Sequence, residues 1–152
     1  MVEVQLLAVG ITGELLGETT HSPAALPAAV RQLNQQMADF YHSEGFQPPW
    51  LGYVSVLGEH IVGGGAFKSP PAHGRVEIAY YTLPEFEGQG CATATAQALI
   101  DLAIKTDETL TVVAQTLPET NASNHLLQKL GFRFFDVVDH PDDGPVWEWH
   151  LF

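Results

Sequence analysis

The residues with the clearest chemical use form a glycine-rich turn, Pro-Glu-Phe-Glu-Gly-Gln-Gly-Cys-Ala-Thr, at positions 84–93. A β-rich run at 76–83 precedes the turn and a helix-forming run at 94–103 follows it. In this order the free N–H groups of the turn and of the first helical turn point toward one spot, where the helix dipole adds partial positive charge. Gly88 and Gly90 remove side chains from the place where a phosphate would approach the backbone. The pattern predicts an anion site, which we interpret as the site for the pyrophosphate of a nucleotide-like cofactor.

The turn differs from two common phosphate-binding motifs. No Gly-Lys-Ser or Gly-Lys-Thr follows it, as a triphosphate-binding loop would require. Thr93 stands where the dinucleotide fingerprint has its third glycine. A second window, Asn-Ala-Ser-Asn-His-Leu-Leu-Gln-Lys-Leu-Gly-Phe at 121–132, reads as an amphipathic helix. Thr120 or Asn121 would cap this helix and Gly131 would stop it.

Together the two windows resemble the GNAT superfamily of N-acetyltransferases, which use acetyl-CoA. The family's first motif, Gln/Arg-x-x-Gly-x-Gly/Ala, corresponds to Glu87-x-x-Gly90-x-Ala92. Its second motif corresponds to Asn121, Ser123 and the Gln-Lys-Leu-Gly-Phe run at 128–132. Residues 76–80 resemble the branch that acetylates the N-termini of ribosomal proteins.

The resemblance implies an α/β (α+β) fold, a mixed, twisted β-sheet flanked by helices with two splayed central parallel strands at 76–83 and 109–116. The pantetheine arm of the cofactor would enter between them and pair with main-chain groups in the manner of an added strand. The cofactor-binding residues implied are Tyr81, Thr82, Leu83, Gly88, Gln89, Gly90, Cys91, Ala92, Thr93 and Asn121.

Two side chains are implied for catalysis. Glu77, on the strand before the turn, would be the base that removes a proton from the attacking amine, since only a neutral amine attacks a thioester. In a partly buried cleft its pKa would rise, which suits a base; the alternative is an ordinary surface glutamate. Ser123 would hold or protonate the departing thiolate; the alternative is a small residue chosen for packing.

Three positions qualify this assignment. Glu87 replaces the usual Gln or Arg, so its side chain should point away from the pyrophosphate. Leu127 stands where many members have a tyrosine general acid. Cys91 suggests a covalent acyl-enzyme, but packing is the favoured interpretation of a cysteine at that turn.

The reaction expected is direct transfer of an acetyl group from acetyl-CoA to a primary amine of a small molecule or peptide. Glu87 and Leu127 depart from the family motifs and motivate an alternative function, a non-catalytic acyl-CoA-binding module of the same fold. Transfer of a longer acyl group is a third hypothesis. The acceptor can be a peptide N-terminus, an antibiotic, a polyamine or a small metabolite. A homodimer is also possible.

The composition excludes some classes of function. Six Lys and Arg stand against eighteen Asp and Glu, a net charge of −12, which argues against nucleic-acid binding. The acidic balance would attract an amine, or would serve only solubility. The sequence has no apolar run long enough for a membrane span and no signal segment. A single cysteine fits a reducing cytoplasm, and the seven scattered histidines lack metal-ligand spacing.

The elements that would position these residues make a single domain over 1–152. We expect a strand within 2–9, a loop at 20–27 and a helix at 28–41. The helix would turn Val30, Leu33, Met37 and Phe40 or Tyr41 toward the core and Gln32, Asn34, Gln35 and Asp39 toward solvent. Strands at 51–57 and 61–68 follow, and the three glycines of the second predict a bulge or a close backbone approach. A turn at 139–145 would separate strands at 132–138 and 146–152, and Trp147 and Trp149 would share a face. Trp50, Tyr53, Phe40, Tyr41 and Phe46 would be core or would wall the acceptor pocket.

Overall fold

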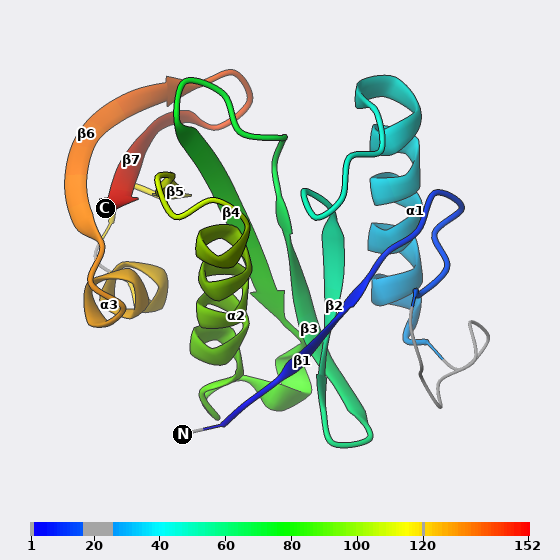
Figure 1. Ribbon diagram of the computed structural model, residues 1–152. Helices are drawn as coiled ribbons and strands as arrows, with labels where there is room; N and C mark the ends of the chain where they lie inside the picture. The colour runs from blue at the N-terminus through cyan, green and yellow to red at the C-terminus, as the bar shows by residue number, and fades with distance from the viewer. Residues whose placement is uncertain (1, 17–25, 120) are drawn as a thin grey trace.

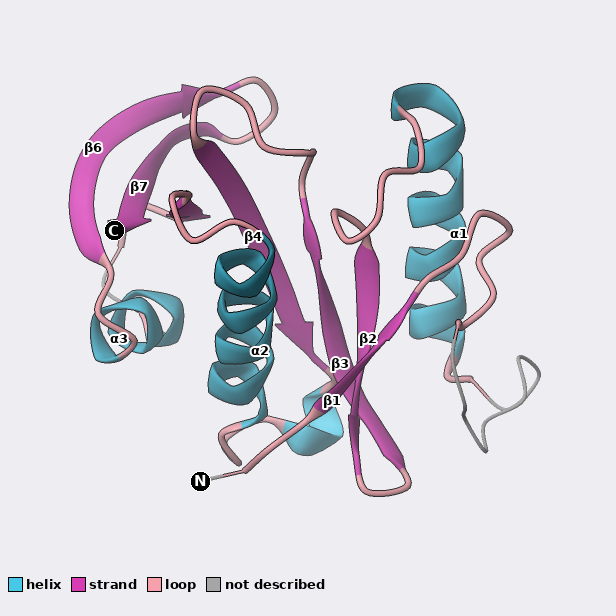
Figure 2. Ribbon diagram, in the orientation of Figure 1, coloured by secondary structure: helices cyan, strands magenta, loops and turns pink. Residues whose placement is uncertain are grey.

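The computed structural model describes residues 2–16, 26–119 and 121–152. It is a mixed sheet flanked by helices (Figures 1 and 2), which confirms the predicted fold class. The elements in chain order are β1 (Gln5–Ala8), α1 (Ala28–Glu44), β2 (Gly52–Leu57), β3 (His60–Phe67), β4 (Arg75–Thr82), a 3₁₀ turn (Pro84–Phe86), α2 (Cys91–Thr106), β5 (Thr111–Thr116), α3 (Ala122–Lys129), β6 (Arg133–His140) and β7 (Gly144–Leu151).

The seven strands lie in the order β1-β2-β3-β4-β5-β7-β6. Every neighbouring pair is antiparallel except β4 and β5, which are parallel. Their pairing runs only from Arg75↔Thr111 to Ile78↔Ala114. Beyond those residues the two strands separate, so the splay expected of the central parallel strands is present.

Helices α1 and α2 cover opposite faces of the sheet. Successive side chains of a strand point to opposite faces, and on β2 the Ser55 hydroxyl lies 2.7 Å from the Thr95 hydroxyl of α2. Its neighbour Val54 packs instead in the cluster that contains Val30 of α1. The central strands are therefore covered on both sides, as their nearly continuous burial requires.

The glycines of β3 allow a close approach between strands, as predicted. A Cβ added to Gly64 would lie 2.4 Å from the Tyr53 carbonyl oxygen and 2.8 Å from the Tyr81 hydroxyl oxygen. One added to Gly63 would lie 2.2 Å from the Tyr81 carbonyl oxygen. The register also shifts between Ser55 and its neighbour on β2, which is the predicted bulge.

The face of α1 differs from the prediction. The buried residues are Val30, Asn34, Ala38 and Tyr41. Val30 and Tyr41 were expected there, whereas Asn34 and Ala38 take the places expected for Leu33 and Met37. Leu33 is 39% exposed, and Asn34, expected in solvent, is only 4% exposed. Tyr41 fixes this rotation, because its hydroxyl donates to the Val9 carbonyl at 2.9 Å and accepts from the Gly52 amide at 2.8 Å.

One predicted loop is shorter in the structure, and another lies mostly outside the described residues. The expected turn at 139–145 is shorter, because β6 continues to His140 and β7 begins at Gly144. The loop expected at 20–27 lies mostly outside the described residues. Phe134 of β6 lies against both Trp147 and Trp149 of β7, at distances of 5.9 Å between ring centres, which confirms that the two tryptophans share a face.

Candidate functional site

The glycine-rich turn places free amides at the start of α2. Gly88 and Gly90 have φ angles of 76° and 83°, values that glycine adopts without steric cost. Gly90 caps the helix, and no side chain bonds to its first N–H groups. The first helical hydrogen bond runs from the Ala94 amide to the Gly90 carbonyl, so the amides of Cys91, Ala92 and Thr93 have no helical acceptor. The predicted anion site has this geometry.

These amides open onto a cavity of about 720 Å³ between the end of β4 and helices α2 and α3. We call it the cofactor cavity. Of the residues assigned to the cofactor from the sequence, the cavity is lined by Tyr81, Thr82, Gly88, Gly90, Cys91, Ala92 and Thr93. Exposed Glu87, expected to point away, also lines it.

Gln89, Leu83 and Asn121 do not line the cofactor cavity. The Gln89 side-chain amide donates to the Glu85 carbonyl at 3.4 Å. The Asn121 side chain caps α3, since its oxygen accepts from the Asn124 amide at 3.1 Å. The structure thus gives Asn121 the capping role that the sequence offered as an alternative.

Beyond Ile78, the side of β4 that faces β5 is free to bind a ligand. The Lys68 amide donates to the Glu77 carbonyl, and the Leu83 amide donates to the Val62 carbonyl. Because partners toward one neighbour recur every second residue, the main-chain groups of Tyr81 also face β3. Those of Tyr80 and Thr82 face β5, from which β4 has separated by then. Among the residues expected to pair with the cofactor, Thr82 therefore faces the opening, while Leu83 is bonded to β3.

An unpartnered polar atom supports the same use of this edge. The Thr82 side-chain oxygen is buried and has no hydrogen-bond partner, a costly arrangement unless a ligand supplies one. A ligand with hydrogen-bonding groups along an extended arm, such as pantetheine, would satisfy both this oxygen and the free edge. Lys129 and His125 also line the cavity. Sequence reasoning gave them no role, although Lys129 lies within the second motif.

Glu77 lines a second, smaller cavity of about 220 Å³ where β4 and β5 separate. We call this cavity the reaction gap. The Glu77 carboxylate lies 3.5 Å from the Lys68 ammonium, and its side chain is 24% exposed. Burial raises the pKa of Glu77, Lys68 and His140 oppose the rise, and the nearby Glu148 adds to it. The partly buried cleft and the direction of the pKa shift are those expected for Glu77.

Tyr80 connects the parts of the site, and sequence reasoning gave it no role. It lines the cofactor cavity, the reaction gap and a third cavity described below. Burial raises the pKa of its hydroxyl to about 12, and the neighbouring Ser123 side chain opposes this rise. Ser123 itself lines both the cofactor cavity and the reaction gap. The two candidate catalytic residues and Tyr80 thus meet at one place.

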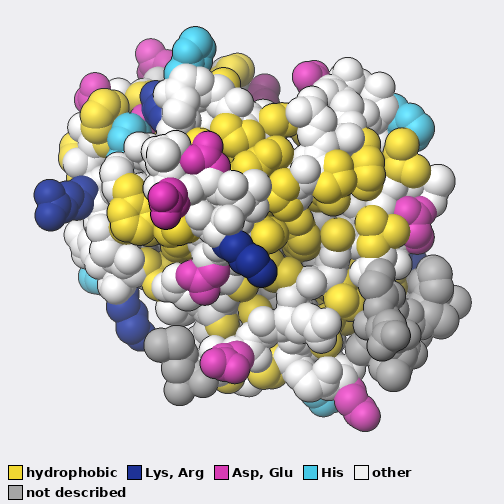
Figure 3. All heavy atoms as spheres, in the orientation of Figure 1, with side chains coloured by type: hydrophobic (Ala, Val, Ile, Leu, Met, Phe, Trp, Pro, Cys, Tyr) yellow, Lys and Arg dark blue, Asp and Glu magenta, His cyan; other side chains and the backbone are white. Residues whose placement is uncertain are grey.

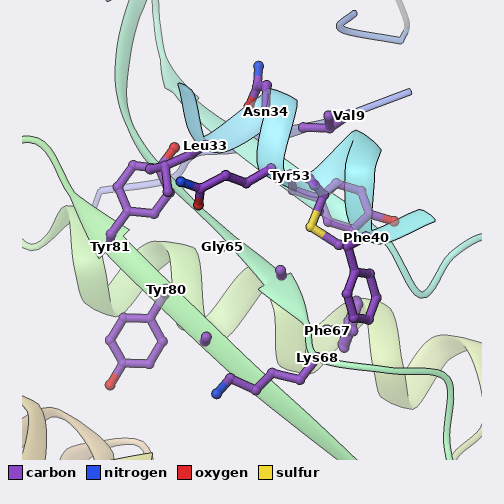
Figure 4. Close-up of a pocket in the computed structure, with 15 residues that line it drawn as sticks. Val9, Leu33, Asn34, Phe40, Tyr53, Gly65, Phe67, Lys68, Tyr80 and Tyr81 are labelled. Carbon is purple, nitrogen blue, oxygen red and sulfur yellow. The ribbon is translucent and has the colours of Figure 1, made fainter. Parts of the chain in front are cut away.

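The third cavity, of about 480 Å³, lies between α1 and strands β2–β4 (Figure 4). We call it the acceptor cavity. Phe40 and Tyr53 line it, whereas Trp50 packs edge-on against Phe67 at 5.0 Å. Three residues of α1 that were expected in the core, Leu33, Met37 and Phe40, line this cavity, and Met37 and Phe40 also pack against the core.

Cys91 is 1% exposed at the start of α2 and forms no disulfide, in keeping with a packing role. Within the described ranges, no cluster of three or more His, Cys, Asp or Glu side chains is suited to a metal ion. In the same part of the chain, no helix combines the length and apolar character needed to cross a membrane.

Comparison with known families gives one match, to the model of the acetyltransferase (GNAT) domain over residues 15–133. A comparison with curated proteins gives no match in sequence.

Three solved structures of similar fold are distant in sequence. Apo RimL, a ribosomal-protein α-N-acetyltransferase, is 18% identical with a TM-score of 0.71 over 99% of this chain and 94% of that chain. A chimera of the spermidine N-acetyltransferase SpeG from Vibrio cholerae is 14% identical with a TM-score of 0.69 over 98% and 95%. A YncA acetyltransferase structure from Salmonella typhimurium, which contains acetyl-CoA, is 19% identical with a TM-score of 0.60 over 80% and 72%.

Proposed function

The chain belongs to the GNAT acetyltransferase family, and on that premise we propose that it transfers an acetyl group from acetyl-CoA to a primary amine of a small molecule or peptide by direct attack. The observation that carries the proposal is the meeting of the cofactor cavity and the reaction gap at Tyr80 and Ser123, beside the Glu77 carboxylate. The proposal covers residues 1–152 as one acetyltransferase domain acting in the cytoplasm.

Acetyl-CoA supplies the thioester, and the chain holds it at two places. The amides of Cys91, Ala92 and Thr93 bind the pyrophosphate at the positive end of α2. The free edge of β4 at Tyr80 and Thr82 binds the pantetheine arm as an added strand would. Because the chain has only six Lys and Arg, few of which lie on the face seen in Figure 3, main-chain groups provide most of this binding, and Lys129 adds one charge.

Glu77 accepts the proton of the incoming ammonium, directly or through a water, and leaves a neutral nucleophile. Its raised pKa brings the carboxylate closer to the basicity this step needs. Tyr80, with a pKa of about 12, stays neutral at physiological pH. Its hydroxyl is therefore a fixed donor to charge that develops at the reacting atoms, and Ser123 orients that hydroxyl. As the N–C bond forms, the C–S bond breaks and the CoA thiolate leaves, to be held or protonated by Ser123, while the proton taken from the amine passes from Glu77 to solvent.

The test is a free-thiol assay with acetyl-CoA and a panel of amines, run beside thermal unfolding with acetyl-CoA and without it. We expect acetyl-CoA to raise the melting temperature and at least one amine to release thiol. Stabilisation without thiol release on any amine would favour the non-catalytic binding module. An absence of stabilisation at millimolar acetyl-CoA would contradict both functions.

The same approach covers the acyl group and the assembly. The best stabilising acyl-CoA identifies the acyl group that the enzyme transfers, and acetyl is expected.

We propose a homodimer through the edge strand β6, where Phe134, Phe135 and Val137 are about half exposed. Sedimentation should give a dimer that Val137→Lys converts to a monomer, and a monomeric wild type would contradict this assembly.

A further inference from the structure

The acceptor cavity points to the class of amine that the enzyme takes. Its walls are largely apolar: Leu33, Met37 and Phe40 come from α1, and Tyr53, Phe67 and Tyr81 come from the strands. We propose that the acceptor is a primary amine joined to one bulky, neutral, apolar group. This proposal rests on the proposed function and deepens it.

The two ends of the site differ in charge. The reaction gap contains two carboxylates, Glu77 and Asp143, beside Lys68 and His140, so an ammonium group that enters there finds a counter-ion. No Asp or Glu is among the described residues that line the acceptor cavity, and Lys68 is the one charged residue there. A second ammonium in that cavity would lose its hydration without gaining a counter-ion, because the one charged side chain there, Lys68, is itself a cation and is paired with Glu77. A polyamine is therefore disfavoured, although the protein as a whole is acidic.

The acceptor cavity and the reaction gap adjoin each other. Lys68, Ala79 and Tyr80 line both of them. Figure 4 shows Lys68 and Tyr80 at the lower end of the acceptor cavity and Leu33 and Tyr81 at its upper left. Phe40 and Tyr53 lie on its right side in the same view. A single ligand can thus keep its amine at the gap and its apolar body against α1.

The size of the cavity fits a bulky group. A volume of about 480 Å³ lies within the range of pockets that enclose a small organic ligand. Such a group occurs on an aryl-alkyl amine and also on a peptide whose first residue is apolar. The recognition chemistry is the same in the two cases, so the experiment contains both sources.

The first experiment compares kcat/KM for phenylethylamine, ethanolamine and spermidine, and for peptides that begin with Phe or Ser. We expect phenylethylamine or the Phe peptide to exceed its polar counterpart by about tenfold or more, the discrimination typical of an apolar pocket. Calorimetry of the same amines with the CoA-bound protein should give the same order of affinity. Spermidine as the best acceptor, or equal values within both pairs (phenylethylamine with ethanolamine, and the Phe peptide with the Ser peptide), would overturn the inference while leaving the acetyltransferase function intact.

A charge placed in the cavity supplies the second experiment. Leu33→Glu adds a carboxylate at a cavity position that is 39% exposed, so the fold should tolerate it. Gln32→Glu is the matched control, because Gln32 is exposed on the same helix and does not line the cavity. We expect Leu33→Glu to lower kcat/KM for phenylethylamine about tenfold and to raise that for spermidine, with Gln32→Glu near wild type.

The thermal shift with CoA should be the same in wild type and both variants, which separates acceptor recognition from cofactor binding. Identical acceptor preferences in Leu33→Glu and Gln32→Glu would overturn the assignment of this cavity. An absence of thiol release with every amine in wild type would instead reject the proposed function itself.

Discussion

The Lys68 ammonium lies 3.5 Å from the Glu77 carboxylate, at the boundary between the acceptor cavity and the reaction gap. The carboxylate is thereby held where the amine must arrive. Burial raises the pKa of Glu77 and the neighbouring ammonium opposes that rise. The basicity of Glu77 is thus set by a side chain that also borders the acceptor.

Glu77→Gln should lower kcat about 100-fold or more, the usual contribution of a general base, because the amide cannot accept the proton. The melting-temperature rise with acetyl-CoA should stay at its wild-type value, since Glu77 does not line the cofactor cavity. Steady-state kinetics and thermal unfolding check the two effects. Unchanged kcat would remove Glu77 from the mechanism.

The pH dependence should follow the raised pKa of Glu77. The rate should increase with pH as this carboxyl ionises, and Lys68→Met should move the increase to higher pH because it removes the opposing charge. The contribution of Glu77 to folding stability depends on pH in the opposite direction. A carboxyl whose pKa is raised by folding stabilises the protein below its unfolded pKa, and this contribution is lost as pH rises through the folded pKa.

Glu77→Gln should therefore be at least as stable as wild type at pH 7, and denaturant unfolding at pH 7 and pH 4 measures the difference. A pH–rate profile that Lys68→Met leaves in place would argue against coupling of these two groups.

Gly90→Glu should abolish CoA binding, because it puts an acid into the space for the pyrophosphate and removes the conformational freedom of glycine at φ 83°. Gly74→Glu is the matched control, with φ 73°, exposed, open space around the Cβ and no part in the cofactor cavity. Calorimetry with CoA distinguishes the two variants. Equal affinity in both would refute the pyrophosphate site at this turn.

Tyr80→Phe should lower kcat about 100-fold, the cost of removing a preorganised donor to developing charge, with little change in CoA affinity. If Ser123 acts by orienting Tyr80, the effects of Tyr80→Phe and Ser123→Ala should not add in the double variant. A structural role for Tyr80 would instead appear as lost stability with kcat retained. Full additivity of the two substitutions would show that the residues act separately.

The strands and helices were predictable because their periodicity and stop signals are local. The glycine turn, the cap at Asn121 and the stop at Gly131 depend on short-range chemistry. The rotation of α1 was not predictable, since it depends on the Tyr41 hydroxyl reaching Val9 and Gly52 across the fold.

Tyr80 was missed for a related reason. The sequence contains two adjacent tyrosines, and only the sheet register shows that the main-chain edge of the first faces the opening between β4 and β5. Ser123 and Glu77 were proposed because the family resemblance marked their positions. Lys68, far from both motifs in the sequence, could be found only from its distance to Glu77.

The free edge of β4 has a consequence for amide hydrogen exchange. The amides of Tyr80 and Thr82 point into the opening beyond the last β4–β5 pair, whereas the Leu83 amide is bonded to Val62. Without ligand, the first two should exchange quickly and the third slowly, although all three lie within four residues of one another. A bound pantetheine would slow the first two and leave the third as it was. Amide exchange would then show the bound cofactor protecting this edge of β4 as a neighbouring strand would.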